Sequence, residues 1–224
     1  MLRISLIFYI LSFFVFPAFC QKIFMTGDSH VSISIYPQKV GEVLVEENPN
    51  IDFSFWGKGG AGFYTFNDNQ EFMDILYDAC PDILIVHLGT NDSYARQFNE
   101  ERLTKNVTTF YNNFHSRLPE CKIIFVTPFY NKNKEKGTGN WQVNKNTRLC
   151  ADALLAFSRK HPGVTVIDNN ADYGMMFLEE EGLIRSDYVH LTVEGYHELG
   201  QQVADAIISL GLWDLEEPPY FESY

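Results

Sequence analysis

KIFMTGDSH, residues 22–30, joins a short apolar run to a polar turn that contains glycine. The apolar run predicts a strand, and runs of the same kind recur along the chain. Several of them are continuously apolar or β-branched, which is typical of strands covered on both faces. The predicted strands are Lys22–Met25, Ile51–Trp56, Ile83–Leu88, Lys122–Thr127 and Val164–Ile167.

Segments of helical length separate these strands and carry apolar residues at helical spacing. A final helix, Val193–Leu210, begins after Thr192, which is a good N-cap residue. Strands that alternate with helices of this length predict βαβ crossovers and a parallel sheet, so we expect one α/β domain with about five parallel strands. The other predicted helices are Gln38–Glu47, Gln70–Ala79, Leu103–Leu118 and Val143–Lys160.

Composition limits the classes of protein to consider. The chain has 224 residues, of which 46% are hydrophobic and 21% charged, as in an ordinary globular domain. The 17 Lys and Arg residues face 29 Asp and Glu residues, so the formal net charge is -12. A surface of this sign repels phosphate backbones, and binding of nucleic acid or of anionic lipid is therefore disfavoured.

The N-terminus has the three-part pattern of a secretory signal peptide. One positive charge precedes an apolar run over residues 4–18, which is shorter than the roughly 20 residues that span a bilayer. Ala18-Phe19-Cys20 then resembles a cleavage site. We expect a signal peptide over 1–20, a mature domain over 21–212, an acidic tail over 213–224, and a secreted or periplasmic protein without stable membrane insertion. Anchoring through an uncleaved N-terminal segment is the alternative.

Three cysteines remain after cleavage at this site: Cys80, Cys121 and Cys150. Cys80 and Cys121 each precede a predicted strand, and in a parallel sheet these positions lie at the same end. A disulfide between them and two isolated buried thiols are both compatible with this spacing. The sequence has no CxxC motif and no Cys/His ligand spacing, which argues against a structural zinc site.

Ligands of an open parallel sheet bind outside the carboxyl ends of the strands. Polar or glycine-rich clusters follow the first three predicted strands, and a fourth cluster precedes the last helix. We expect all four to converge on one rim of the domain. They are Thr26-Gly27-Asp28-Ser29-His30, Gly57-Lys58-Gly59-Gly60-Ala61-Gly62, Gly89-Thr90-Asn91-Asp92 and Asp187-Tyr188-Val189-His190.

These clusters contain every group that acyl transfer from an ester requires. Ser29 supplies a hydroxyl nucleophile, His190 a base, and Asp187 a carboxylate three residues earlier that can orient the imidazole. The backbone N–H groups of Ser29 and Gly60 and the side-chain amide of Asn91 can donate to an oxyanion. Each cluster alone has a structural explanation as a turn, a loop or a helix cap. Their joint occurrence in this order favours catalysis.

At these residues the chain resembles the SGNH hydrolases, also called the GDSL esterase/lipase family, over Thr26 to about Leu210. The resemblance implies a flavodoxin-like three-layer α/β/α fold. It also implies a metal-free and cofactor-free mechanism in which Ser29, His190 and Asp187 are catalytic and Ser29, Gly60 and Asn91 form the oxyanion hole. The matching blocks are Gly27-Asp28-Ser29-His30, the glycine cluster around Gly60, Gly89-Thr90-Asn91-Asp92 and Asp187-Tyr188-Val189-His190-Leu191-Thr192.

Residue 30 is His where many family members have Leu, and this resembles the branch that contains peptidoglycan and other polysaccharide O-acetylesterases. His30 either lines the pocket or packs beside the first helix. Aromatic side chains near the rim, Phe63, Tyr64 and Trp141, are candidates for stacking on a sugar ring, and they would equally suit an alkyl groove. We therefore expect a carbohydrate O-acetylesterase whose partner is an acetylated carbohydrate. A lipase, a lysophospholipase, a thioesterase or a non-catalytic glycan-binding relative is the alternative.

Four further histidines are expected to have structural roles only. His87 lies inside the third predicted strand, where we expect a buried ring with satisfied hydrogen bonds. His115, His161 and His197 are placed on helix faces or at a helix end, where we expect solvent exposure.

Overall fold

The computed structural model describes residues 20–94, 98–129, 141–169, 182–187 and 189–211. Within these ranges the chain forms a five-stranded, all-parallel sheet in the order β2-β1-β3-β4-β5. The expected fold class is thus confirmed. The strands are β1 Gln21–Gly27, β2 Ile51–Gly57, β3 Ile83–His87, β4 Lys122–Val126 and β5 Val164–Ile167.

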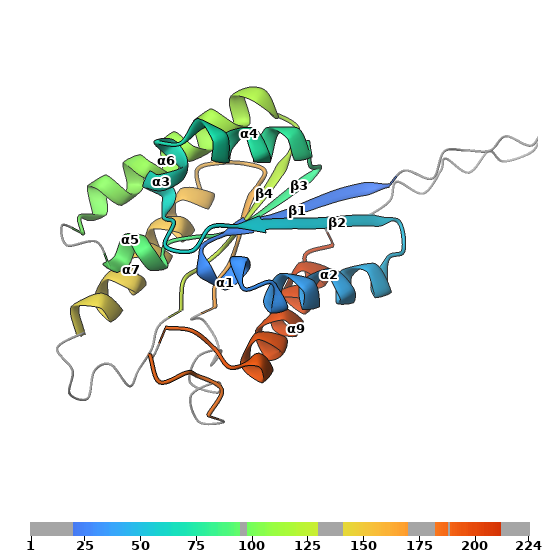
Figure 1. Ribbon diagram of the computed structural model, residues 1–224. Helices are drawn as coiled ribbons and strands as arrows, with labels where there is room; N and C mark the ends of the chain where they lie inside the picture. Colours follow the sequence, from blue (N-terminus) through green and yellow to red (C-terminus); the bar gives the residue numbers. More distant parts are fainter. Residues whose placement is uncertain (1–19, 95–97, 130–140, 170–181, 188, 212–224) are drawn as a thin grey trace, which may run out of the picture.

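Helices cover both faces of the sheet and make three layers (Figure 1). Helices α2 and α9 pack together on one face, and α3, α4, α6 and α7 cover the other. The helices are α1 Ser29–Ser32, α2 Ile35–Glu47, α3 Phe63–Asn67, α4 Gln70–Ala79, α5 Thr90–Tyr94, α6 Glu100–Arg117, α7 Trp141–Ser158 and α9 Val193–Ser209.

Successive side chains of the central strands point to opposite faces of the sheet, and this divides the hydrophobic core between the two faces. Ile23 and Met25 of β1 pack with α2 and α9, whereas Phe24 between them packs with the opposite helices. Strand β3 repeats this pattern with Ile85 and Leu84. Because both faces bury apolar side chains, β1 and β3 read as nearly continuous apolar runs, which is why the sequence predicted them.

The sheet order creates a switch point between β1 and β3. From β1 the chain moves to β2 at one edge of the sheet and then returns to β3 on the other side. Gly27 pairs with Gly57 on β2 and with His87 on β3, so the segments that follow these strands start at one level. A Cβ at Gly27 would lie 2.5 Å from the His87 carbonyl oxygen, and the close approach therefore requires glycine.

The predicted strands and long helices agree with the structure to within about three residues, and β5 and α4 agree at both ends. Three short helices, α1, α3 and α5, were not predicted. They have four or five residues each, which is too short for a helical period to show.

The suggested disulfide between Cys80 and Cys121 is absent from the structure, in which both residues are free thiols. Cys80 is exposed and ends α4 in the left-handed conformation, with φ 43°. Cys121 is buried, and burial raises the pKa of its thiol to about 12.

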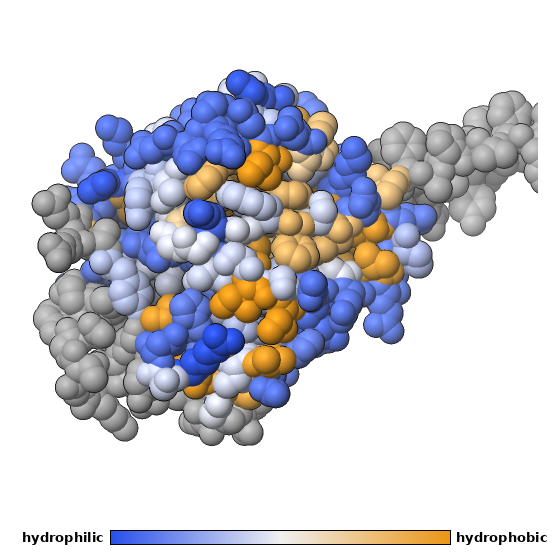
Figure 2. Space-filling model, viewed as in Figure 1, coloured by the Kyte–Doolittle hydropathy of each residue, from blue (hydrophilic) through white to orange (hydrophobic). Residues whose placement is uncertain are grey.

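Hydrophilic residues cover most of the upper helical layer in the space-filling view, and a more apolar band crosses the region of the edge strand β2 (Figure 2). Phe53, Phe55 and Trp56 of this strand are half-buried. Across the described parts of the chain, no helix combines the length and hydropathy that a membrane span needs. Residues 1–19 of the expected signal peptide and the whole expected acidic tail lie outside the described residues.

Candidate active site at the switch point of the sheet

Ser29 is the first residue of α1, directly beyond the end of β1. Asp28 caps this helix, because its Oδ1 accepts a 3.0 Å hydrogen bond from the His30 N–H. The first N–H groups of a helix have no acceptor within the helix, so the Ser29 N–H is available to a ligand. Among the described residues, the only non-glycine residues with positive φ are Ser34 and Cys80. Ser29 is not one of them, so the candidate nucleophile lies on a turn without this backbone strain.

His190 and Asp187 come from the loop that precedes α9 and meet Ser29 from the opposite end of the chain. The His190 Nε2 lies 2.9 Å from the Ser29 Oγ, and its Nδ1 lies 2.8 Å from Asp187 Oδ2. The other Asp187 oxygen accepts hydrogen bonds of 2.9 Å from the N–H groups of Val189 and His190. The structure thus forms a continuous hydrogen-bonded chain from carboxylate to hydroxyl.

The charge of Asp187 is stabilised by these contacts. Its partial burial opposes ionisation, but the backbone N–H groups of His190 and Val189 and the imidazole outweigh this effect and lower the pKa of Asp187 to about 2. A carboxylate that accepts from Nδ1–H holds the imidazole in the tautomer whose Nε2 can accept a proton from Ser29.

Asn91 and Gly60 follow β3 and β2, the two strands that flank β1 in the sheet. The Asn91 Nδ2 donates to the Ala61 carbonyl at 2.9 Å and lies 3.4 Å from Asp28 Oδ2. Gly60 has φ +78°, a conformation that favours glycine, and a Cβ there would meet no atom within 4 Å. The neighbouring Lys58 and Ala61 N–H groups are used in backbone hydrogen bonds, whereas the exposed Gly60 forms none within the described loop.

Two buried carboxyl groups hold these segments together. Asp28 is fully buried, and this burial raises its pKa to about 7 despite the hydrogen bond from the His30 N–H. Asp92 is 5% exposed, and its Oδ2 accepts a 3.1 Å hydrogen bond from the Phe63 N–H. Burial raises the pKa of Asp92 to about 6. Sequence reasoning missed both supporting roles, although each residue is adjacent to a candidate site residue.

The sequence of the chain matches one known protein family. A model of the GDSL-like lipase/acylhydrolase family matches residues 27–198, which include all four clusters. The chain belongs to this family. Its members are also known as SGNH hydrolases, and the chain is a carboxylic ester hydrolase. No curated protein matches the sequence significantly.

Solved structures share the fold of this GDSL-family chain at low sequence identity. A peptidoglycan O-acetylesterase structure is 12% identical with a TM-score of 0.72, and the match covers 87% of this chain and 92% of that one. An acetylxylan esterase from Geobacillus stearothermophilus is 16% identical with a TM-score of 0.66, over 84% and 94% of the two chains. An acetyl esterase mutant with an acetate ion is 17% identical with a TM-score of 0.68, over 85% and 97%.

Two of the candidate substrate-binding residues of this GDSL-family protein are buried. Phe63 is 0% exposed and packs in the core against Phe110 and Phe125, so the expectation that it contacts substrate is wrong. His30 is also 0% exposed, so it packs beneath α1 and does not line the pocket. Tyr64 is half-buried and lines a cavity. The Trp141 side chain lies outside what the structure describes.

His30 is part of a second connection, behind the catalytic candidates. Its Nδ1 lies 3.2 Å from the Tyr196 hydroxyl, and its ring centroid lies 5.6 Å from that of His190. The Leu191 backbone N–H interacts with the same Tyr196 oxygen. The buried Tyr196 hydroxyl thereby links His30, which follows Ser29, to Leu191, which follows His190. Burial, with smaller effects from neighbouring histidines, lowers the pKa of His30 well below its usual value, so the ring is neutral.

His87 is buried as expected, but the expected satisfaction of its ring is wrong. Neither ring nitrogen has a hydrogen-bond partner among the described residues. The ring packs against His30, Tyr36 and Phe129, and burial lowers its pKa to about 3. Of the remaining histidines His197 is exposed, whereas His115 and His161 are half-buried and stack on aromatic rings of their own segments.

Proposed function

We propose that the chain is a secreted serine esterase that removes acetyl groups from carbohydrate through Ser29, His190 and Asp187. The observation that carries this proposal is the continuous chain of hydrogen bonds from Asp187 through His190 to the Ser29 hydroxyl, at 2.8 and 2.9 Å. This arrangement supplies a nucleophile, a base and a group that orients the base. Residues 1–20 would be the signal peptide, residues 21–212 the catalytic domain and residues 213–224 a tail.

The proposed cycle begins when His190 Nε2 accepts the Ser29 proton and the Ser29 Oγ attacks the ester carbonyl carbon. The imidazolium that forms is stabilised by Asp187, which the low pKa keeps ionised across the working range. The tetrahedral intermediate collapses when His190 returns the proton to the leaving alcohol oxygen. Water, activated by the same imidazole, then attacks the acyl-serine and releases the carboxylic acid.

The negative oxygen of the intermediate would be stabilised by the Ser29 N–H, the Gly60 N–H and the Asn91 amide. Gly60 is suited to this role because its N–H forms no bond within the described loop and its surface is exposed. Asn91 is suited because a 2.9 Å bond to the Ala61 carbonyl anchors one of its amide N–H groups, and the second, which has only a long 3.4 Å contact with Asp28 Oδ2, would turn to the oxyanion. Donors held in place before the reaction cost no reorganisation when the charge develops.

Acetylated carbohydrate is proposed as the substrate because of the solved structures that share the fold. They are a peptidoglycan O-acetylesterase, an acetylxylan esterase and an acetyl esterase. Export would place the enzyme where such polymers occur. The acidic surface suits a neutral ester, which needs no cationic clamp.

Hydrolysis of 4-nitrophenyl esters from acetate to decanoate by the purified protein tests this proposal. We expect acetate to be the best substrate and Ser29→Ala to reduce kcat by at least about 10³-fold. Ser54→Ala, a change at an exposed serine of β2, is the matched control and should retain full activity. A preference for long acyl chains would indicate a lipase, and hydrolysis that survives Ser29→Ala would overturn the mechanism. Acetate release from acetylated peptidoglycan and acetylated xylan then identifies the polymer.

A further inference from the structure

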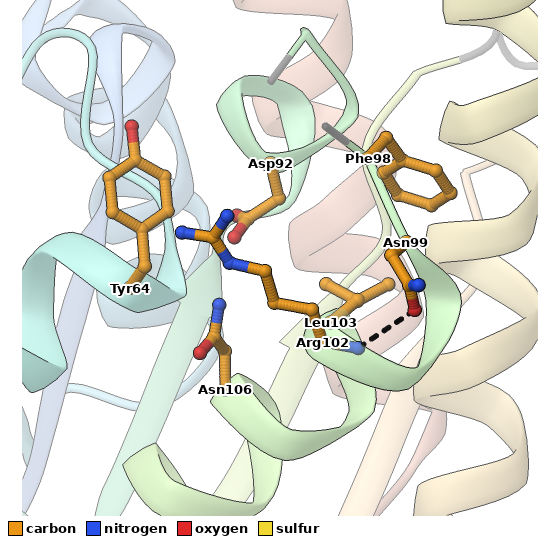
Figure 3. Close-up of a pocket in the computed structure, with 7 residues that line it drawn as sticks. All are labelled: Tyr64, Asp92, Phe98, Asn99, Arg102, Leu103 and Asn106. Carbon is orange, nitrogen blue, oxygen red and sulfur yellow. Dashed lines mark hydrogen bonds between the residues drawn. The ribbon is translucent and has the colours of Figure 1, made fainter. Parts of the chain in front are cut away.

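A cavity of about 250 Å³, lined by both polar and apolar side chains, lies between α3, α5 and the first turns of α6. The close-up of this cavity shows the Arg102 guanidinium extending between Tyr64 and Asp92, with the Asn106 amide below it (Figure 3). The cavity is lined by Tyr64, Asp92, Phe98, Asn99, Arg102, Leu103 and Asn106.

Asp92 connects the cavity to the segments that carry the proposed oxyanion donors Asn91 and Gly60. Asp92 follows Asn91 directly, and its Oδ2 accepts a 3.1 Å hydrogen bond from the Phe63 N–H at the start of α3. A Cβ at Gly62 would lie 2.6 Å from this oxygen, so the glycine loop is packed tightly against Asp92. Tyr64 is four residues from Gly60, which limits their Cα atoms to a separation of about 15 Å. A group in the cavity therefore lies within a few sugar lengths of the reacting ester.

Two of the polar side chains in the cavity, those of Arg102 and Asn106, are available to a ligand. Within the described parts of the chain, no ion pair or side-chain hydrogen bond involves the Arg102 guanidinium, and the Asn106 amide has no bonded partner. Asp92 contributes a carboxyl group beside them (Figure 3). The rings of Tyr64 and Phe98 provide flat apolar surface at the same place. Donors, an acceptor and aromatic rings thus converge on one small space.

We propose that this cavity binds an uncharged sugar residue of the alcohol part of the substrate, within a few residues of the one that carries the ester. This inference rests on the proposed esterase function. A cavity of about 250 Å³ has the volume of roughly eight liquid waters, which suits one sugar ring rather than a polymer segment. Hydroxyl groups both donate and accept, so Arg102 and Asp92 side by side match a pair of neighbouring hydroxyls.

The charges favour a neutral sugar over an acidic one. A ligand carboxylate that approached Arg102 would also approach the Asp92 carboxyl group and the surface of a chain whose formal net charge is -12. The attraction to the guanidinium would be offset by this repulsion. A neutral hydroxyl pair meets no such opposition.

The test compares acetylated xylotriose with ethyl acetate, whose alcohol is too small to reach the cavity, by measuring acetate release. Arg102→Met should lower the ratio of kcat/KM for xylotriose to that for ethyl acetate by about tenfold, the effect of losing one hydrogen bond from a charged group. The change should lie mainly in KM. Arg117→Met, at the exposed far end of α6, is the control and should leave the ratio unchanged.

An unchanged ratio in Arg102→Met, with both esters hydrolysed by the unaltered protein, would overturn the cavity proposal and leave the esterase function intact. If the unaltered protein hydrolyses neither acetylated xylotriose nor ethyl acetate, the proposed esterase function itself is refuted. A third substrate, an acetylated oligosaccharide of uronic acids, tests the charge argument. If Arg102→Met reduces kcat/KM for this acidic substrate more than for xylotriose, the site binds a carboxylate and the proposal of a neutral sugar is wrong.

Discussion

Replacing Asp28 by asparagine should make the stability of the protein less dependent on pH between 3.8 and about 7. Asp28 is fully buried at the centre of the site, where it caps α1 through the His30 N–H and lies 3.4 Å from the Asn91 amide. Asparagine retains an oxygen that can accept the bond from the His30 N–H. It has no titrating proton, so the substitution removes the charge and largely preserves the shape.

The magnitude follows from the pKa, which burial raises from 3.8 to about 7. Because the folded state holds this proton more tightly than the unfolded state, stability from Asp28 is complete below pH 3.8 and decreases as pH rises towards 7. The total loss is about 4 kcal/mol at about 1.4 kcal/mol for each pKa unit. Between pH 5 and pH 8 the same relation predicts a loss of about 2–3 kcal/mol.

Urea unfolding at pH 5, 6, 7 and 8, followed by circular dichroism, measures the effect. The free energy of unfolding of Asp28→Asn, minus that of the unaltered protein, should rise by about 2–3 kcal/mol over this range. Other titrating groups, including Asp92, are present in both proteins and largely cancel. Asp152→Asn, at an exposed position of α7, is the control and should give a constant difference. A constant difference for Asp28→Asn as well would refute the argument that burial dominates this carboxyl group.

Three further substitutions test other contacts. Asn91→Ala should lower kcat for 4-nitrophenyl acetate by about 10²–10³-fold and the melting temperature by only a few degrees, the effect of losing its bond to the Ala61 carbonyl, and a loss of kcat below tenfold would contradict its proposed oxyanion role. Gly62→Ala should destabilise by about 1–3 kcal/mol in thermal melts because its Cβ would lie 2.6 Å from a buried carboxyl oxygen, whereas Gly59→Ala should be tolerated. Tyr196→Phe should cost about 1–3 kcal/mol in urea unfolding because it leaves the buried His30 Nδ1 without its hydroxyl partner, and equal stability would contradict that contribution.

Much of the site was predictable because its geometry follows from the sheet. Ser29 and Asn91 come immediately after strands, and parallel strands bring their carboxyl ends to one edge. Asp187 and His190 are three residues apart, a spacing at which a short turn alone can join carboxylate and imidazole. The meeting of Ser29 and His190 across 161 residues followed from placing both beside the same rim.

Burial of individual side chains was less predictable. Phe63 was expected at the rim because it follows a glycine loop, but α3 turns its ring into the core. The sequence left open whether His30 lines the pocket or packs beside the first helix. In the structure its side chain is fully buried. In a helix of four or five residues the direction of each side chain is set by the helix's orientation on the sheet. Four or five residues are too few for a hydrophobic periodicity that would indicate this orientation.

The sequence by itself determined the α/β class, the order of the strands and long helices, the three clusters at strand ends and the fourth before the last helix, because these depend on local periodicity and on the geometry of parallel sheets. Only the tertiary structure decided that Asp28 and Asp92 are buried, that Cys80 and Cys121 remain thiols, and that Arg102 faces a cavity beside the site. Each of these depends on which surfaces of separate elements meet. That is a property of packing between residues far apart in the chain, which local patterns do not contain.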